Sequence, residues 1–231
     1  MAAMQCSMIR DLDDSREMWR IVVRVLRRWN SYHKNSPNQL YAICLLLVDQ
    51  QGHKIQASIM NKSLFKQYER EPLEGHCYFI ANLEVIPNRK DYKAANHQFK
   101  LLFNTTTYVK EENADIPLSV FDFFPIKDIL TQTVDTHTMF LFDVIAFLIS
   151  IDTLEEYYSG TDHKTKLRLM LGDGRGNIVQ MVLYHDCAST FAAQDFTAIQ
   201  TPTVLLAQLA RIGFNEGGWP EVCSSFNATK I

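Results

Sequence analysis

One stretch of this chain occurs twice, and this repeat limits the possible fold more than any other feature. Residues 45–60 (LLLVDQQGHKIQASIM) recur as residues 169–184 (LMLGDGRGNIVQMVLY). Each copy has an apolar strand, an Asp-x-x-Gly turn and a second strand with alternating side chains. This pattern is typical of a β-hairpin whose glycine supplies the positive φ of the turn. The chain therefore contains one β unit twice.

Length and composition fit two ordinary globular domains. The 231 residues are 47% hydrophobic and 21% charged, which excludes a disordered chain. No window of about 18 apolar residues and no signal-peptide pattern is present, so we expect a soluble protein that is not secreted. The five cysteines form no Cys-x-x-Cys pair, which predicts reduced, buried thiols rather than disulfides or a structural zinc site.

Charge is distributed unequally between the two halves. Residues 1–117 hold 16 Lys and Arg against 13 Asp and Glu, a net charge of +3. Residues 118–231 hold 7 against 13, a net charge of −6. A polyanion is therefore expected to meet the first half more readily than the second.

The two halves have the same predicted order of elements. The first half reads as a strand (19–25), a long cationic loop (27–39), the first hairpin copy, a helix (62–71) capped by Asn61, a basic hairpin tip (86–96) and a last strand (98–103). The second half reads as a strand (140–149), a long loop (152–165), the second hairpin copy (166–184), a helix (186–196) and two strands (203–212 and 220–229).

This order is the Greek key of an OB-fold, with the helix between the third and fourth strands. We therefore predict an all-β chain with short helices, folded as two tandem OB-fold Greek-key barrels. The predicted boundaries are 1–112 for the first barrel, 113–120 for a linker and 121–231 for the second barrel.

Several fragments, in this order and spacing, resemble a known family. They are the Leu45–Ala57 hairpin, the ending Phe103-Asn104-x-Thr106-Thr107-x-Val109, the Phe121-Asp122-Phe123 segment, the Asp173–Gly176 turn, Ala210-Arg211-Ile212 and the Ser224-Ser225 ending. Together they resemble the two central single-stranded-DNA-binding OB domains of the large subunit of replication protein A, in its plant-type form. The family's N-terminal protein-docking domain and zinc-containing C-terminal domain have no counterpart here, which fits a short relative and a fragment equally.

The resemblance implies which residues of the first domain meet DNA. Tyr92 matches a family stacking aromatic at the hairpin tip, and Tyr41 is our substitute for the second, which falls near the non-aromatic Ile43. Trp29 either closes over the strand or packs into the barrel mouth. Cations of the long loop and the hairpin tip are expected to contact phosphates. They are Arg27, Arg28, Lys34, Arg89, Lys90 and Lys93.

In the second domain the family's stacking aromatics fall at Tyr184 and near Phe214, with Trp219 close by, and its groove arginine falls at Arg211. Tyr184 as a residue of the barrel core or rim remains an equal alternative. The long loop here carries four acids, at positions 152, 155, 156 and 162, where a strand-binding loop is expected to carry cations. We therefore expect the first domain to contribute more to binding than the second.

Function follows from the resemblance and from what the sequence lacks. The seven histidines have no metal-ligand spacing, and neither a P-loop nor a nucleophile motif is present, so we expect no enzyme, metal or cofactor. We predict sequence-tolerant single-stranded DNA binding in DNA replication, repair or recombination in the nucleus, with replication or repair proteins as further partners and neither a membrane nor a small-molecule substrate. The alternative is an OB-fold protein-interaction module whose acidic second domain holds a basic partner.

Overall fold

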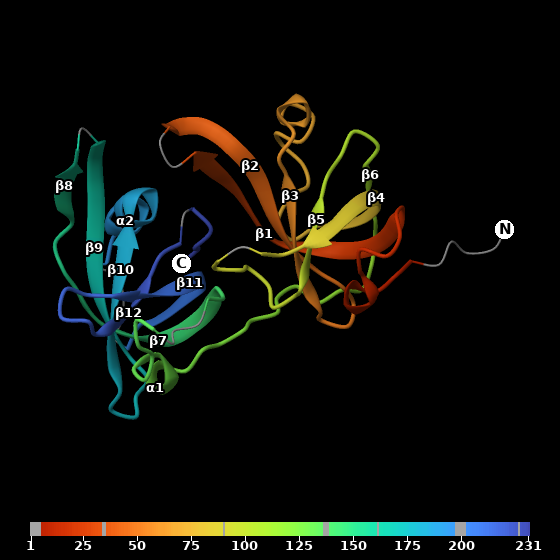
Figure 1. Cartoon of the computed structure of the whole chain (residues 1–231). Coiled ribbons are helices and arrows are strands. Elements are labelled where there is room, and N and C mark those ends of the chain that lie inside the picture. Colours follow the sequence, from red (N-terminus) through yellow and green to blue (C-terminus); the bar gives the residue numbers. More distant parts are fainter. Residues whose placement is uncertain are drawn as a thin grey trace. The chain divides into compact units, whose positions relative to one another are not determined.

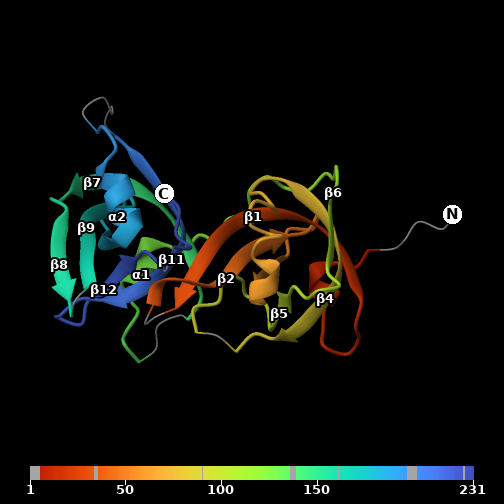
Figure 2. The ribbon, with the colours of Figure 1, turned by 90° about the horizontal axis from the view of Figure 1, so that it is seen from above.

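The computed structural model of the protein describes residues 6–33, 36–89, 91–135, 139–160, 162–196, 202–225 and 227–231. The chain divides into two compact units, Met1–Val120 and Phe121–Ile231. Figures 1 and 2 show that the strands of each unit curl around a core of their own. Within the described residues, no helix combines the length and the apolar character that crossing a membrane requires.

In the described part of the first unit, the strands close into a barrel. These strands are β1 (Trp19–His33), β2 (Ser36–Val48), β3 (Lys54–Ile59), β4 (Cys77–Pro87) and β5 (Phe99–Leu102). They pair in the order β1-β2-β3-β5-β4, and β4 pairs again with β1. β3 and β5 are parallel, whereas the other neighbours are antiparallel. A short strand, β6 (Tyr108–Glu111), lies beside β4.

The second unit repeats this topology. Its barrel is formed by β7 (Phe142–Ile151), β9 (Asp162–Gly172), β10 (Ile178–Tyr184), β11 (Val204–Phe214) and β12 (Pro220–Cys223). The pairing order is β10-β12-β11-β7-β9, β9 pairs again with β10, and β10 and β12 are parallel. An added strand, β8 (Glu155–Ser159), pairs with β9. Both units have the strand order of the OB-fold, so the prediction of two tandem OB-fold barrels is confirmed.

The repeated hairpin has the predicted conformation in both units. Asp49 Oδ1 accepts hydrogen bonds from the backbone N–H groups two and four residues later, at 2.9 and 3.0 Å. Asp173 Oδ1 accepts the same pair, at 2.8 and 3.2 Å. Gly52 and Gly176 follow with φ of 82° and 95°. The aspartate closes the turn and the glycine allows its left-handed backbone, which explains why these two residues occur in both copies.

The prediction of a long loop in each half, at residues 27–39 and 152–165, is wrong. Residues 27–33 belong to β1 and residues 36–39 to β2, and the two strands pair as far as His33 and Ser36; residues 152–165 contain β8 and the start of β9. In both places two strands extend past the barrel as a ribbon. An alternating apolar pattern marks a strand only where one of its faces is buried, so the sequence of a ribbon solvated on both faces reads as a loop.

Both predicted helices are shorter in the structure. Residues 62–71 contain only η2 (Lys62–Leu64), and the second helix, α2, covers His185–Ala192. Two further short helices are η1 (Ile9–Asp11) and α1 (Ile126–Ile129). Asn61 does cap η2, because its side chain accepts a hydrogen bond from the N–H of Ser63 at 3.0 Å.

In the segment 113–120, Ile116 packs in a buried cluster with Val48 and Cys77. Of the free cysteines, Cys44, Cys77 and Cys223 are buried, whereas Cys6 and Cys187 are half-buried, which corrects part of the prediction.

Candidate nucleic-acid interface

The register of β1, β2 and β3 defines the outer face of the first barrel. Ile43, Leu45 and Leu47 of β2 belong to the core, so the alternate residues of this strand face outward. Residues paired directly across a sheet share a face. Two outward rows result: Arg27, Leu46 and Gln56 in one, and Trp29, Cys44 and Ser58 in the other. In an OB-fold this face and its two flanking loops form the oligonucleotide site.

Arg27 and Arg28 have different positions and partners. Arg27 is buried on the outer face and forms an ion pair with Glu74. Arg28 pairs with the core residue Leu45, so it lies on the opposite face. Its guanidinium donates to the carbonyls of Tyr68 and Glu69 at 2.8 and 2.7 Å, and burial lowers its pKa. Arg28 therefore holds the turn after η2, and of the two arginines Arg27 is the one on the candidate face.

Two aromatic candidates of the first unit, Trp29 and Tyr41, lie on the β1–β2 ribbon. Trp29 is half-buried on the outer face, opposite Cys44. Tyr41 lies at an irregularity, where Ser31 pairs with Ala42 but the next residue pairs with Leu40. Its ring meets His33 edge-on, with 5.0 Å between the ring centroids. Lys34, a further predicted contact, lies outside the described residues.

The connection between β4 and β5 is less exposed than the sequence indicates. Arg89 is exposed, whereas Tyr92 and Lys93 are half-buried, and Lys90 lies outside the described residues. Tyr92 has a φ of 55°, which is uncommon for a residue other than glycine. Tyr92 and Lys93 also interact with other residues of the chain, so this tip is packed more closely than an open hairpin tip.

In the second unit the outer face carries cations. Leu167, Leu169 and Leu171 of β9 are buried in the core, so the alternate residues Lys166 and Arg168 face outward. Lys166 of β9 is opposite Tyr184 of β10. A neighbouring row crosses four strands, because Arg168 is opposite Val182, Val182 is opposite Cys223, and Cys223 is opposite Arg211. The register thus brings the predicted Tyr184 and Arg211 onto one face with two cations that the prediction missed.

Tyr184 and Arg211 line the same cavity. Its volume is about 180 Å³, and its other lining residues include His185 and Ser224. Burial raises the pKa of the Tyr184 phenol to about 12, so the ring stays neutral at physiological pH. A neutral aromatic ring beside a guanidinium is an arrangement on which a base can stack while a phosphate meets the cation.

The β11–β12 hairpin presents the remaining two candidates. Phe214 is half-buried and packs against the second core. Trp219 is 72% exposed. The Asn215 side chain accepts hydrogen bonds from the N–H groups of Gly217 and Trp219, at 2.9 and 3.0 Å, and so fixes the turn. A Cβ on Gly217 would lie 3.1 Å from the Trp219 ring, so the glycine leaves room for the indole. Trp219 therefore presents an aromatic ring to solvent, whereas Phe214 packs against the barrel core.

Two of the four acids in the second long segment pair with residues of the neighbouring strand. Glu155 forms ion pairs with Arg168 and with Lys166, the latter at 3.1 Å. Glu156 lies on the other face of the ribbon and pairs with His163 at 3.2 Å. Glu155 and Glu156 therefore have partners that the sequence pattern alone does not show, while Asp152 is exposed. The signal for the missed cations was the alternation of Lys166 and Arg168 with the buried Leu167 and Leu169, a period of two that predicts one common face.

The described residues contain no group of three or more His, Cys, Asp or Glu side chains placed to hold a metal ion. The chemistry that the two outer faces offer consists of aromatic surfaces and of guanidinium and ammonium groups, whereas Gln56 and Ser58 of the first unit are buried. These groups bind anions and planar rings.

Two OB-folds in tandem, each with an outer face of this kind, make the chain a tandem OB-fold protein. It belongs to the family described as "Domain of unknown function DUF223", whose model matches residues 10–132, just over half of the chain.

Relatives confirm the resemblance to replication protein A. The chain is 25% identical over 182 residues to a 70 kDa DNA-binding subunit of replication protein A from Oryza sativa subsp. japonica, and the match covers 76% of this chain and 27% of the relative. It is 24% identical over 206 residues to a 70 kDa DNA-binding subunit of the same protein from Arabidopsis thaliana, a match that covers 86% of this chain and 32% of the relative. The chain thus spans about a third of the length of these relatives.

A solved structure of a replication protein A heterotrimer bound to ssDNA has the same fold. It superimposes with a TM-score of 0.66 at 20% identity, covering 97% of this chain and 50% of that chain. The likeness extends over both OB-folds and includes their order along the chain.

Proposed function

We propose that this protein binds single-stranded DNA through the outer faces of its two OB-folds, with little dependence on sequence. The observation that carries this proposal is the register of β9, β10, β12 and β11, which gathers Tyr184, Arg211, Lys166 and Arg168 on one face. Bases stack on the aromatic rings in this proposal, and the cations meet phosphates. The names of the relatives, DNA-binding subunits of replication protein A, support the same ligand.

The wider role follows from the relatives. The protein acts in DNA replication, repair or recombination in the nucleus, without catalysis, alongside other replication or repair proteins. Residues Trp29, Tyr41, Arg89, Tyr92 and Lys93 supply the contacts of the first unit in this proposal, on and beside the face that contains Arg27.

Titration of a fluorescent 30-nucleotide oligo-dT with the purified chain tests the proposal. We expect anisotropy to rise to saturation at low salt, and log K to fall against log salt with a slope of roughly −2 to −4, because about three to five cations contact phosphates at about 0.7 each. No binding at low salt would contradict the proposal. A matched double-stranded oligonucleotide is the control, and equal affinity for it would also contradict stacking on unpaired bases.

A second candidate function is a protein-interaction module. The net charge of −6 on residues 118–231 favours it, because such a domain attracts basic proteins. The same titration separates the two candidates, since a module of this kind leaves the oligo-dT free.

A further inference from the structure

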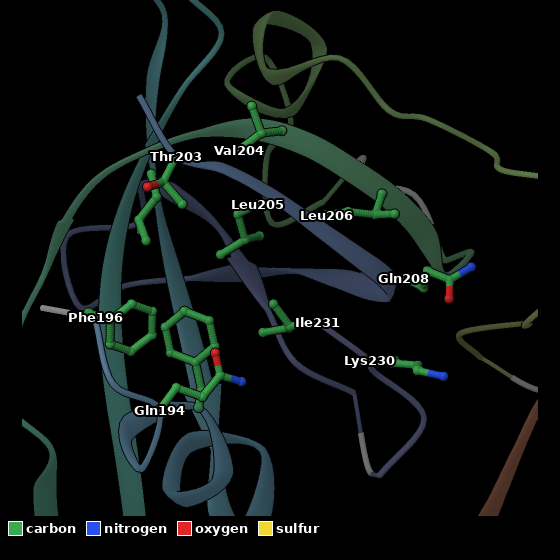
Figure 3. A pocket seen from close by; sticks show the side chains of 11 residues that line it. Gln194, Phe196, Thr203, Val204, Leu205, Leu206, Gln208, Lys230 and Ile231 are labelled. Atoms are coloured by element: carbon green, nitrogen blue, oxygen red, sulfur yellow. The ribbon is translucent and has the colours of Figure 1, made fainter. Parts of the chain in front are cut away.

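Two neighbouring strands of the second barrel turn large apolar side chains toward solvent. β7 and β11 are antiparallel, and their register places Val204 opposite Phe147 and Leu206 opposite Ile145. The alternate residues Ala146 and Leu205 are buried in the core. Figure 3 shows the same division on β11, where Leu205 points toward Phe196 and Ile231, whereas the side chains of Val204 and Leu206, which also line this pocket, leave the strand on its other side.

The exposed side chains form a continuous face across four strands. Ile145, Phe147, Ile149 and Val204 are 52%, 40%, 54% and 55% exposed. Gly172 of β9 is opposite Phe147 on one side and opposite Ile178 on the other, and Ile178 is also half-exposed. We call this set the β7–β11 face, and it comprises Ile145, Phe147, Ile149, Ile178, Val204 and Leu206.

Two glycines shape this face. A Cβ on Gly172 would come within 2.8 Å of the Ile149 side chain, and a Cβ on Gly174 would come within 3.0 Å of the Phe147 ring. The glycines therefore leave the room in which these two side chains lie over the β9–β10 hairpin. Contiguous exposed apolar surface of this kind is uncommon on soluble proteins and marks interaction sites.

The charge around the β7–β11 face selects the kind of occupant. Asp152 directly follows β7, and Asp173 lies between the two glycines. Hydrogen bonds from Asn177 and from the Arg175 backbone lower the pKa of Asp173, which keeps it charged. Arg175 at the same hairpin tip offsets part of this charge. Two carboxylates against one guanidinium leave the surroundings of this face with an excess of negative charge, which favours a basic occupant.

We propose that the β7–β11 face is a docking surface for another protein, and that the docked segment combines two or more large apolar side chains with flanking Lys or Arg. The apolar side chains pack on Phe147 and Ile149, and the cations meet Asp152 and Asp173. This face shares no residue with the face of Tyr184 and Arg211, so protein and DNA can be bound together.

Peptide selection on the full chain tests this proposal without knowledge of the partner. A phage library of random 12-residue peptides is panned on the wild-type protein, and each enriched peptide is measured against the double variant Ile149→Thr/Val204→Thr. Threonine keeps the β-branched shape that strands favour, and circular dichroism checks the fold. The variant Leu118→Thr, in the first unit, is the control because Leu118 is also exposed.

We expect the enriched peptides to be apolar and basic, and to bind the double variant about tenfold more weakly than the wild-type protein and the control. Acidic peptides, or equal binding by all three proteins, would overturn the proposal. So would self-association of the wild-type chain in sedimentation that the double variant abolishes, because the occupant would then be a second copy.

Oligo-dT binding is measured in parallel on the same three proteins. Equal affinities support the separation of the two faces, whereas loss in the double variant would assign the β7–β11 face to DNA and overturn the proposal. If the wild-type chain binds the peptides but not oligo-dT, the proposed DNA function fails and the docking surface stands.

Discussion

Glu155 forms ion pairs with the two cations that a phosphate would contact on the second barrel. Its carboxylate pairs with Lys166 and Arg168, and both cations face outward beside Tyr184. A phosphate bound at these cations would lie close to the carboxylate and be repelled by it. Replacing Glu155 by Gln removes this repulsion and frees both cations. We therefore expect the variant Glu155→Gln to bind oligo-dT more tightly than the wild-type chain.

The structure sets the size of the effect. Two unit charges about 4 Å apart interact by roughly 1 kcal/mol in water and more near a protein surface. Glu155 is 43% exposed, so solvent and salt keep the value at the lower end. We expect a gain of about 1 kcal/mol, which is about fivefold in affinity. The salt dependence is expected to steepen by roughly 0.7 to 1.4, because one or two further phosphates are contacted.

The assay is an anisotropy titration of labelled oligo-dT at several salt concentrations and at pH 8. The matched control is Glu156→Gln, which removes the same charge from the opposite face of the ribbon, where Glu156 pairs with His163. Equal gains in the two variants would mean that net charge alone acts. Weaker binding by Glu155→Gln would refute the reasoning, because it would show that Glu155 orders the ribbon for DNA instead of competing with it.

Three further predictions concern single side chains. Arg28→Ala is expected to lower the free energy of unfolding by about 1–3 kcal/mol, since the carbonyls of Tyr68 and Glu69 lose their donor, and chemical denaturation measures this loss. The folded variant is expected to keep its oligo-dT affinity within about twofold in titration, and a large loss of affinity would show that Arg28 contacts DNA. Tyr184→Ala is expected to weaken binding by about 1–3 kcal/mol and Tyr184→Phe by less than about 0.5 kcal/mol. Because the pKa of the Tyr184 phenol is about 12, DNA binding by the wild type is expected to be independent of Tyr184 ionisation from pH 7 to 9, and a change in affinity near pH 8 that Tyr184→Phe abolishes would contradict this. Trp219→Ala is expected to cost a similar amount of binding with an unchanged melting temperature, because the indole is exposed, and a fall in that temperature would assign it to the fold.

The fold was predictable because its strongest signals are local. The Asp-x-x-Gly turns of Asp49 and Asp173 fix two hairpins through hydrogen bonds only two and four residues long. The ribbons were not predictable, since strands solvated on both faces carry no alternating apolar pattern.

The candidate site was predictable only in part. Tyr184 and Arg211 lie on strands whose register follows from the hairpin and the core, so the sequence brings them together correctly. The role of Arg28 depends on carbonyls of Tyr68 and Glu69, which a one-dimensional pattern cannot place. The ion pairs of Glu155 with Lys166 and Arg168 were not predictable, because they depend on the pairing of β8 with β9.

Photo-cross-linking to single-stranded DNA tests the central claim most directly. A 30-nucleotide oligo-dT with 5-iodouracil at spaced positions is bound to the full chain, irradiated and analysed by mass spectrometry, because this base couples to an aromatic ring on which it stacks. The account predicts cross-links to Tyr184 and Trp219 of the second unit and to Trp29 of the first. Cross-links to Phe147 on the β7–β11 face, with none to Tyr184 or Trp219, would contradict it.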